Sequence, residues 1–222
     1  MKLRLLSTLF LLPLLSYSQN WKESDYQKFN ASSFLSLPAL TQALDFNKLD
    51  YPLLQAAIFY LTNLEREKYQ LKPFQFSPEV EKTASGHAQD MVNYNFYSHT
   101  SPIRFRRTLR DRLNCSGLNP KYIGENICST FGLQYEEGKK VGKPAKPGEF
   151  YYLNASNPSK IPPHTYLSFA KSVVNLWMKS PGHRQNILNP AFTHLGCGAF
   201  VYFEKSFYGM PYFMAVQNFI AR

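Results

Sequence analysis

The chain has 222 residues, of which 44% are hydrophobic and 18% are charged, and its formal net charge at pH 7 is +10. This length is sufficient for one sizeable hydrophobic core with additional surface segments. The basic balance favours anionic partners, such as acidic polymers or lipid head groups. No nucleic-acid-binding module is recognisable, so nucleic acid is not expected as a partner.

Residues 1–18 have the features of a secretory signal peptide. Lys2 and Arg4 form a basic start, and 5–15 is an apolar run too short to span a bilayer. Small residues at the end of this segment predict cleavage before Gln19. Removal of the segment would lower the net charge to +8, because it contains two basic residues and no acid. The mature chain has no later stretch that predicts a transmembrane helix, so we expect a secreted or periplasmic protein.

The three cysteines, Cys115, Cys128 and Cys197, all follow the predicted signal peptide. In an oxidising compartment this count predicts one disulfide and one free thiol, and Cys115–Cys128 is the favoured pair because it closes a short loop. The spacing matches no zinc signature. Cys197 lies between two glycines in a strand pattern, which indicates a structural role rather than a nucleophile.

Helices dominate the first half of the chain. Residues 19–50 are interpreted as an N-terminal extension with one short helix near 39–46. A period of 3.6 residues in the apolar positions predicts an amphipathic helix over 51–69. Ser77 and Pro78 are suited to the start of a second helix that ends around 94–96, with His87 packed on its buried face.

The second half combines helices, a loop and strands. A basic helix with a solvated face is predicted over 103–114. Residues 131–163 contain several Gly, Pro and Lys residues, which predict a long exposed basic loop. A helix is expected from about His164 to Trp177, and alternating patterns at 195–203 and 212–219 predict an antiparallel hairpin. These elements indicate an α+β fold.

Three short polar elements contain the residues suited to chemistry. They are Ser98-His99-Thr100, Gly124-Glu125-Asn126 and Gly182-His183-Arg184. The Pro-Gly pair before His183 predicts that one helix stops there and that a short helical turn follows. Two histidines and a carboxylate could hold a divalent metal such as Zn²⁺. They could also act as an acid–base pair on a bound water, or only stabilise the local backbone.

The order of these elements resembles the CAP superfamily, also called the SCP domain, in its compact bacterial form. The resemblance rests on "HAQDM…FYSHTSP", "GENI" and "W…SPGHRQNILNPAFTHLGCG" and covers about residues 51–220. We therefore delimit a CAP/SCP domain over 51–222. The resemblance implies an α–β–α sandwich, in which helices flank a small antiparallel sheet on both faces.

Family members commonly have two histidines and two glutamates in a central cleft. The resemblance assigns His99, Glu125 and His183 to three of these positions. The second glutamate often lies three residues after a tryptophan, but here Ser180 stands at that spacing from Trp177. Glu136, Glu137 and Glu149 of the long loop are the alternative sources of an acid. The predicted site is therefore a triad, with His99 and His183 as candidate metal ligands.

Two functions fit this triad. The first is a secreted binding module for a lipid, an envelope component or a divalent metal, and the second is a metal-assisted hydrolase with Glu125 as base or ligand. The absent second acid favours the binding module. Asn126 and Arg184 are candidate ligand-binding residues, although Asn126 also fits a role in holding local backbone and Arg184 one in binding a carboxylate or helix-end carbonyls.

Overall fold

The computed structural model describes residues 21–146, 148–153 and 158–222. The predicted signal peptide lies outside the described residues.

A four-stranded sheet forms the centre of the fold, with the strand order β1-β5-β6-β2. The long hairpin of β5 (His194–Glu204) and β6 (Met210–Ile220) confirms the predicted pair of C-terminal strands. β2 (Ile123–Phe131) pairs antiparallel with β6 and forms one edge of the sheet. β1 (Gln75–Phe76) is a short parallel strand at the opposite edge.

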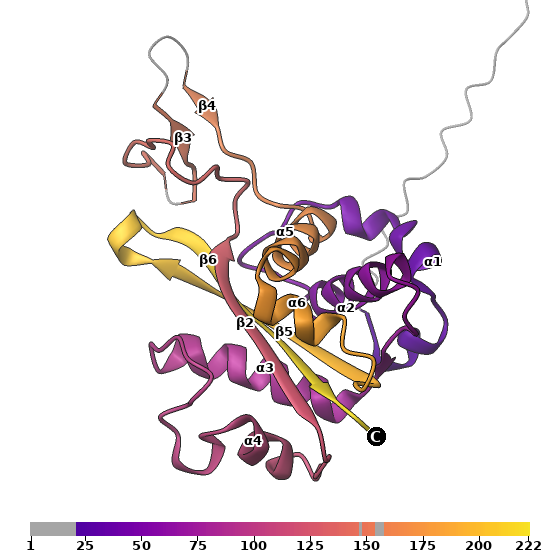
Figure 1. The fold of residues 1–222 in the computed structure, drawn as a ribbon. Coiled ribbons are helices and arrows are strands. Elements are labelled where there is room, and N and C mark those ends of the chain that lie inside the picture. Colours follow the sequence, from indigo (N-terminus) through magenta and orange to yellow (C-terminus); the bar gives the residue numbers. More distant parts are fainter. Residues whose placement is uncertain (1–20, 147, 154–157) are drawn as a thin grey trace, which may run out of the picture.

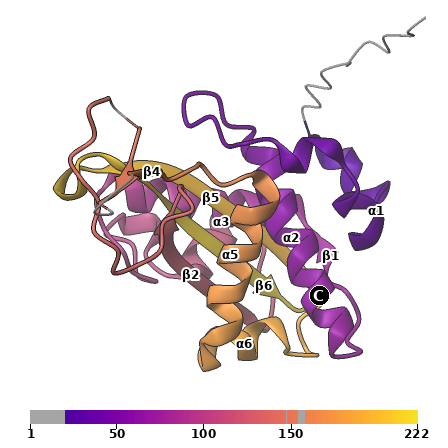
Figure 2. The ribbon, with the colours of Figure 1, turned by 90° about the horizontal axis from the view of Figure 1, so that it is seen from above.

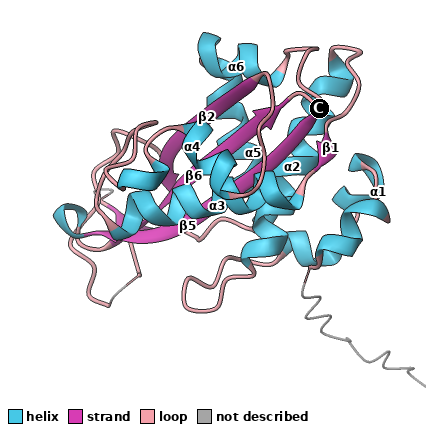
Figure 3. Ribbon diagram, turned by 90° about the horizontal axis from the view of Figure 1, so that it is seen from below, coloured by secondary structure: helices cyan, strands magenta, loops and turns pink. Residues whose placement is uncertain are grey.

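Helices cover both faces of this sheet, as Figures 1 and 2 show. α3 (Pro78–Asn93) packs on one face, with α4 (Leu109–Cys115) beside it. α2 (Tyr51–Lys68) and α5 (Tyr166–Lys179) pack together on the other face. α6 (Pro181–Ile187) follows α5 and contacts β2. This arrangement confirms the α+β class and the α–β–α sandwich; Figure 3 shows the same layers coloured by secondary structure.

Two glycines in β5 allow α3 to lie very close to the sheet. A Cβ at Gly196 would stand 2.1 Å from the backbone N of Glu81, and one at Gly198 would stand 2.4 Å from the backbone N of Ser85. Only glycine permits such an approach between a helix backbone and a strand. The residues of α3 are thereby fixed against the sheet, which matters because α3 supports the candidate site.

The starts of the predicted helices follow their capping residues. Ser77 accepts a hydrogen bond from the backbone N of Val80, as expected for the start of α3. Thr108 caps α4, so the predicted basic helix over 103–114 is in fact a short 3-10 turn, η3 (Arg104–Arg106), followed by a separate helix. Ser180 ends α5 and precedes α6, which confirms the break predicted at Pro181-Gly182.

The N-terminal residues are packed onto the domain rather than extended from it. Trp21, Phe34 and Leu40 are buried in the same core as α2 and α5. The helical turns of this segment are η1 (Glu23–Gln27), α1 (Ala31–Leu35) and η2 (Pro38–Thr41), so the short helix expected near 39–46 lies earlier in the chain.

The described part of residues 131–163 is only partly exposed, contrary to the prediction of a long exposed loop. It contains the small hairpin of β3 (Tyr151–Tyr152) and β4 (Ser159–Lys160). Leu133, Phe150 and Ile161 are buried in a separate small core, which also includes Met210 at the start of β6. The hydrophobic residues between the glycines and lysines therefore have a partner in the sheet hairpin.

The predicted Cys115–Cys128 disulfide is wrong in this structure, where all three cysteines are free thiols. Cys115 is exposed at the end of α4, whereas Cys128 is buried in the core on the α2 and α5 face of the sheet. The sheet separates the two sulfurs. Cys197 is buried in the same core as Cys128, and burial raises the pKa of both thiols, which fits structural roles.

Among the described residues, no helix is both long and apolar enough to cross a membrane.

Candidate functional site

Consecutive residues of the edge strand β2 place the site on two sides of the sheet. Side chains alternate along a strand. Glu125 therefore faces the side of α3 and α4, and its side chain is only 5% exposed. Asn126 faces the opposite side, where its amide contacts α6. The site is thus built around the edge of the sheet.

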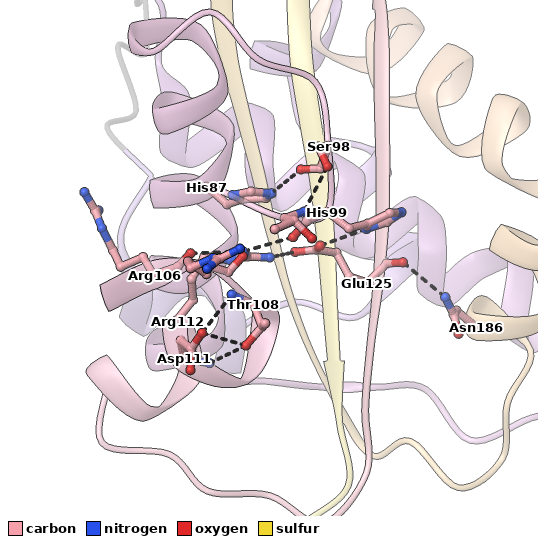
Figure 4. A network of polar contacts seen from close by, with 11 residues as sticks. His87, Ser98, His99, Arg106, Thr108, Asp111, Arg112, Glu125 and Asn186 are labelled. Carbon is pink, nitrogen blue, oxygen red and sulfur yellow. Dashed lines mark hydrogen bonds and ion pairs between the residues drawn. The ribbon is translucent and has the colours of Figure 1, made fainter. Parts of the chain in front are cut away.

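The carboxylate of Glu125 is held by three neighbours, and Figure 4 shows two of them, His99 and Arg112. His99 Nδ1 lies 2.8 Å from Oε1, and Arg112 Nη2 donates to Oε2 at 2.5 Å. The amide of Asn218, in the orientation that suits its own neighbours, donates to Oε2 at 3.0 Å. Both carboxylate oxygens are therefore engaged, and this confines Glu125 to one geometry.

Arg112 is the main partner of Glu125, and it is only 3% exposed. Its Nη1 lies 3.2 Å from the carbonyl oxygens of His99 and Arg107 and 3.4 Å from that of Arg106. One buried guanidinium therefore joins the carboxylate to the loop that carries His99. This fork of donors is a property of arginine that lysine does not share.

These contacts set the protonation state of Glu125. Burial raises the pKa of this carboxyl, but the hydrogen bond with His99 and the positive charge of Arg112 outweigh it and lower the pKa below its usual value. Glu125 is therefore ionised at neutral pH and is a weak base.

The contact with Glu125 also fixes the tautomer of His99. An ionised carboxylate only accepts hydrogen bonds, so Nδ1 of His99 carries the proton and donates it. When the ring is neutral, Nε2 presents a lone pair, and the side chain is 56% exposed. A histidine oriented in this way by a carboxylate is typical of metal and ligand sites.

His183 reaches the site through its backbone rather than through a contact with the carboxylate. It lies in α6, and its backbone oxygen accepts a hydrogen bond from Asn126 Nδ2 at 3.0 Å. Burial and the charge of nearby His99 lower the pKa of the half-buried His183 ring, so the ring is neutral at pH 7. The structure thus brings His99 and Glu125 into direct contact, whereas the His183 ring forms no hydrogen bond with either among the described residues.

The structure gives Asn126 a positioning role. Its amide is fully buried and also contacts Gln217 Oε1 at 3.0 Å and Asn186 Nδ2 at 2.8 Å. Asn186 reaches back to the carbonyl oxygen of Glu125 at 3.3 Å, so the two amides fix α6 against β2. Arg184 contacts Tyr69 instead: its Nη2 donates to the phenol oxygen at 2.9 Å, and the guanidinium lies over the ring.

Three of the positions considered for a second acid have other roles or partners. Ser180 occupies the junction of α5 and α6. Glu136 and Glu149 form ion pairs with Lys139 and Lys160 of their own segment. In the part of the chain that the structure describes, no group of three or more His, Cys, Asp or Glu side chains is arranged to hold a metal ion.

The fit of the site to a metal ion is therefore limited to the two imidazoles. Glu125 does not fit as a ligand, because its oxygens are engaged and Arg112 is adjacent. His99 Nε2 and the His183 ring are the nitrogen donors that would remain for an open site, in which other molecules would complete the coordination of a divalent ion.

The sequence reasoning missed Arg112 and Asn218. Arg112 lies within the basic run that suggested a solvated helix, yet it is only 3% exposed. The pair Thr108 and Asp111, which forms a capping box, fixes the register of α4 and buries Arg112 with Leu113. This capping pair was the feature of the sequence from which the burial of Arg112 could have been predicted. The role of Asn218 depends on the register between β2 and β6, which places Asn218 opposite Glu125.

Comparisons with known proteins agree with this architecture. The sequence profile of CAP, the cysteine-rich secretory protein family, matches residues 128–219. Uncharacterized protein YkwD of Bacillus subtilis is 33% identical over 62% of this chain and 39% of its own length. Uncharacterized membrane protein YlbC of the same organism is 28% identical over 74% of this chain and 34% of its own length.

A solved structure supports the same conclusion. An extracellular protein containing an SCP domain from Bacillus anthracis superposes with a TM-score of 0.53 at 25% identity, over 82% of this chain and 45% of that chain. The match over residues 128–219 and this structural similarity support assignment to the CAP superfamily. It spans less than two fifths of the length of the curated relatives it matches.

Proposed function

We propose that the protein is a secreted binding module whose ligand contacts His99 and His183 at the edge of the sheet. The observation that carries this proposal is the engagement of Glu125 on both oxygens. A carboxylate that is fixed in this way orients an imidazole and supports a binding surface. The extracellular location of the Bacillus anthracis neighbour fits secretion.

Three ligand classes suit this surface: a lipid, an envelope component or a divalent metal. The chemistry of two imidazoles favours a divalent transition ion such as Zn²⁺, bound with open positions. Such an ion would join His99 and His183 to oxygen or nitrogen atoms of a larger ligand. Here the contact with Glu125 orients the His99 ring through Nδ1 and leaves Nε2 available to a ligand, while Asn126 and Asn186 hold α6 in place.

The competing function is a metal-assisted hydrolase, and one observation favours it. Glu125 orients the imidazole of His99, and an imidazole held in this way could accept a proton from water. Glu125 itself is poorly suited to act as the general base, because its pKa is lowered and its oxygens are engaged. We therefore prefer the binding module.

Calorimetric titration of the purified protein with Zn²⁺ tests the proposal. We expect one site, weakened at least tenfold in both His99→Ala and His183→Ala. His194→Ala is the matched control, because His194 is half-buried at the start of β5 and its Nδ1 contacts Thr193. Pull-downs with lipid vesicles and isolated envelope fractions, with and without Zn²⁺, then identify the larger ligand. Equal Zn²⁺ binding in wild type and both variants, together with vesicle and envelope binding that neither variant changes, would contradict the proposal.

A further inference from the structure

The N-terminal segment forms a pocket against α2 and β1, at the edge of the sheet opposite the candidate site. Its volume is about 490 Å³, which is typical of a site for a small molecule. Residues of η1, α1, the second half of α2 and β1 line this pocket. It is formed because the N-terminal segment packs onto α2, so it is separate from the polar motifs around His99 and Glu125.

Aromatic side chains dominate the lining of the pocket. They are Tyr26, Phe29, Phe59, Tyr60, Phe74 and Phe76. Tyr26 and Phe76 stack with their ring centroids 3.6 Å apart, and Phe59 stands edge-on to both, at 5.2 and 6.0 Å. Phe29 and Phe76 are half-buried, so parts of both rings remain accessible. The faces of aromatic rings carry partial negative charge and attract cations.

The two charged residues of the lining are both acidic, although the whole chain has a net charge of +10. They are Glu23 and Glu67, which are exposed. In the described part of the chain neither carboxylate forms an ion pair. A third carboxyl lies beyond the lining, where Glu81 accepts a hydrogen bond from Tyr26 at 2.6 Å. The charge distribution around the pocket therefore favours a cation.

The buried polar side chains of the pocket already have partners within the protein. The Tyr60 hydroxyl donates to the carbonyl oxygens of Tyr26 and Phe29, each at 3.2 Å. Asn63 Oδ1 accepts from the backbone N of Phe74 at 2.7 Å, and Asn63 Nδ2 donates to the carbonyl oxygen of Phe74 at 3.0 Å. A ligand group with hydrogen bonds to satisfy would therefore lose them on entering. A quaternary ammonium has no N–H, and its charge is spread over methyl groups.

One ring of the pocket already contacts a cation. The guanidinium of Arg66 lies 3.8 Å from the ring centroid of Phe74. Arg66 does not line the pocket, and its Nε and Nη1 donate to backbone carbonyl oxygens, which fixes it in place. A further cation would be repelled from Phe74, so we assign it to the accessible rings of Phe29 and Phe76.

We propose that this pocket binds a small organic cation of the quaternary ammonium class. The methyl groups of the ligand pack on the rings of Phe29 and Phe76, and Glu23 and Glu67 balance its charge. An anion would be repelled by both carboxylates, and a neutral molecule would gain no attraction from them. This site does not depend on the function proposed for His99 and His183.

Choline is the probe for this pocket, and aromatic ¹H–¹³C spectra of the purified protein are the readout. We expect choline to cause saturable shifts of the ring signals of Phe29 and Phe76. The uncharged isostere of choline, in which carbon replaces nitrogen, should bind at least fivefold more weakly. A smaller difference between the two molecules, or no saturable shift of these rings with choline in the folded protein, would overturn the proposal.

Two double variants separate binding in the pocket from general electrostatic effects. Glu23→Gln/Glu67→Gln removes both carboxylates of the lining and should weaken choline binding at least fivefold. Glu65→Gln/Glu136→Gln is the matched control, because it removes the same charge from two residues that pair with lysines and do not line the pocket. It should leave choline binding unchanged. Equal choline affinity in the two double variants would refute the assignment to this pocket.

Discussion

Replacement of Arg112 by methionine tests the structural basis of the site. The substitution keeps an unbranched side chain but leaves the buried carboxylate of Glu125 without its cation. Removal of one partner of a buried ion pair costs about 3–5 kcal/mol, because the remaining charge is uncompensated. The carbonyl oxygens of His99, Arg106 and Arg107 also lose a donor, although these contacts are long.

We therefore expect Arg112→Met to lower the free energy of unfolding by about 4 kcal/mol at pH 7. For a domain of this size, that loss corresponds to a fall in Tm of about 8–16 °C. Urea denaturation and thermal melting both measure it. Arg104→Met is the control, because Arg104 is an exposed residue of the same basic run, and we expect it to change stability by less than about 0.5 kcal/mol. A loss below about 1 kcal/mol in Arg112→Met would refute the reasoning.

The deficit should also depend on pH in a definite direction. In the wild type the folded pKa of Glu125 lies below its unfolded value, so this carboxyl stabilises the fold above about pH 4.3, and the contribution is lost as the pH falls through the folded pKa. Without Arg112, burial dominates and raises the folded pKa, so ionisation destabilises the variant as the pH rises. The difference should be largest near pH 7 and small below pH 4. The double variant Arg112→Met/Glu125→Gln should recover part of the loss.

Two further predictions concern α3. Gly196→Ala should lower the free energy of unfolding by at least about 2–3 kcal/mol, because its Cβ would overlap the backbone of α3. Gly182→Ala is the control and should be neutral or stabilising, because a Cβ there meets no atom within 4 Å. Denaturant titration compares the two variants. Glu81, which accepts a hydrogen bond from Tyr26 at 2.6 Å, has a pKa raised by burial to about 7. The folded state therefore binds this proton more tightly than the unfolded state, and stability should fall as the pH rises from about 4.3 through 7. Glu81→Gln should flatten that decline, and an unchanged pH profile would contradict the assignment.

Local patterns were sufficient to predict most of the fold. The cap at Ser77, the break at Pro181 and the alternation in β5 and β6 are all decided by neighbouring residues, and the structure confirms them. The disulfide prediction failed because sequence distance does not show which face of the sheet a residue occupies. Cys128 lies on the face opposite α4, and this depends on the parity of β2 within the whole sheet.

The same limitation applies to the candidate site. His99 and Glu125 were predicted from their motifs, and the structure places them in contact. Arg112 was missed because a buried arginine within a basic run looks like a solvated one until its partner is known. Asn126 is held inside the fold because alternate residues of β2 face opposite sides, which no single motif reveals.

Zinc titration of the imidazole nitrogens tests the central claim most directly. Before the addition of Zn²⁺, and at a pH at which the ring is neutral, the ¹⁵N spectrum should show His99 protonated at Nδ1, with an unprotonated Nε2. Addition of Zn²⁺ should then shift His99 Nε2 and one nitrogen of His183 together, with the same midpoint, while His99 Nδ1 remains protonated. Protonation of His99 at Nε2, or a titration in which neither ring responds, would contradict the account.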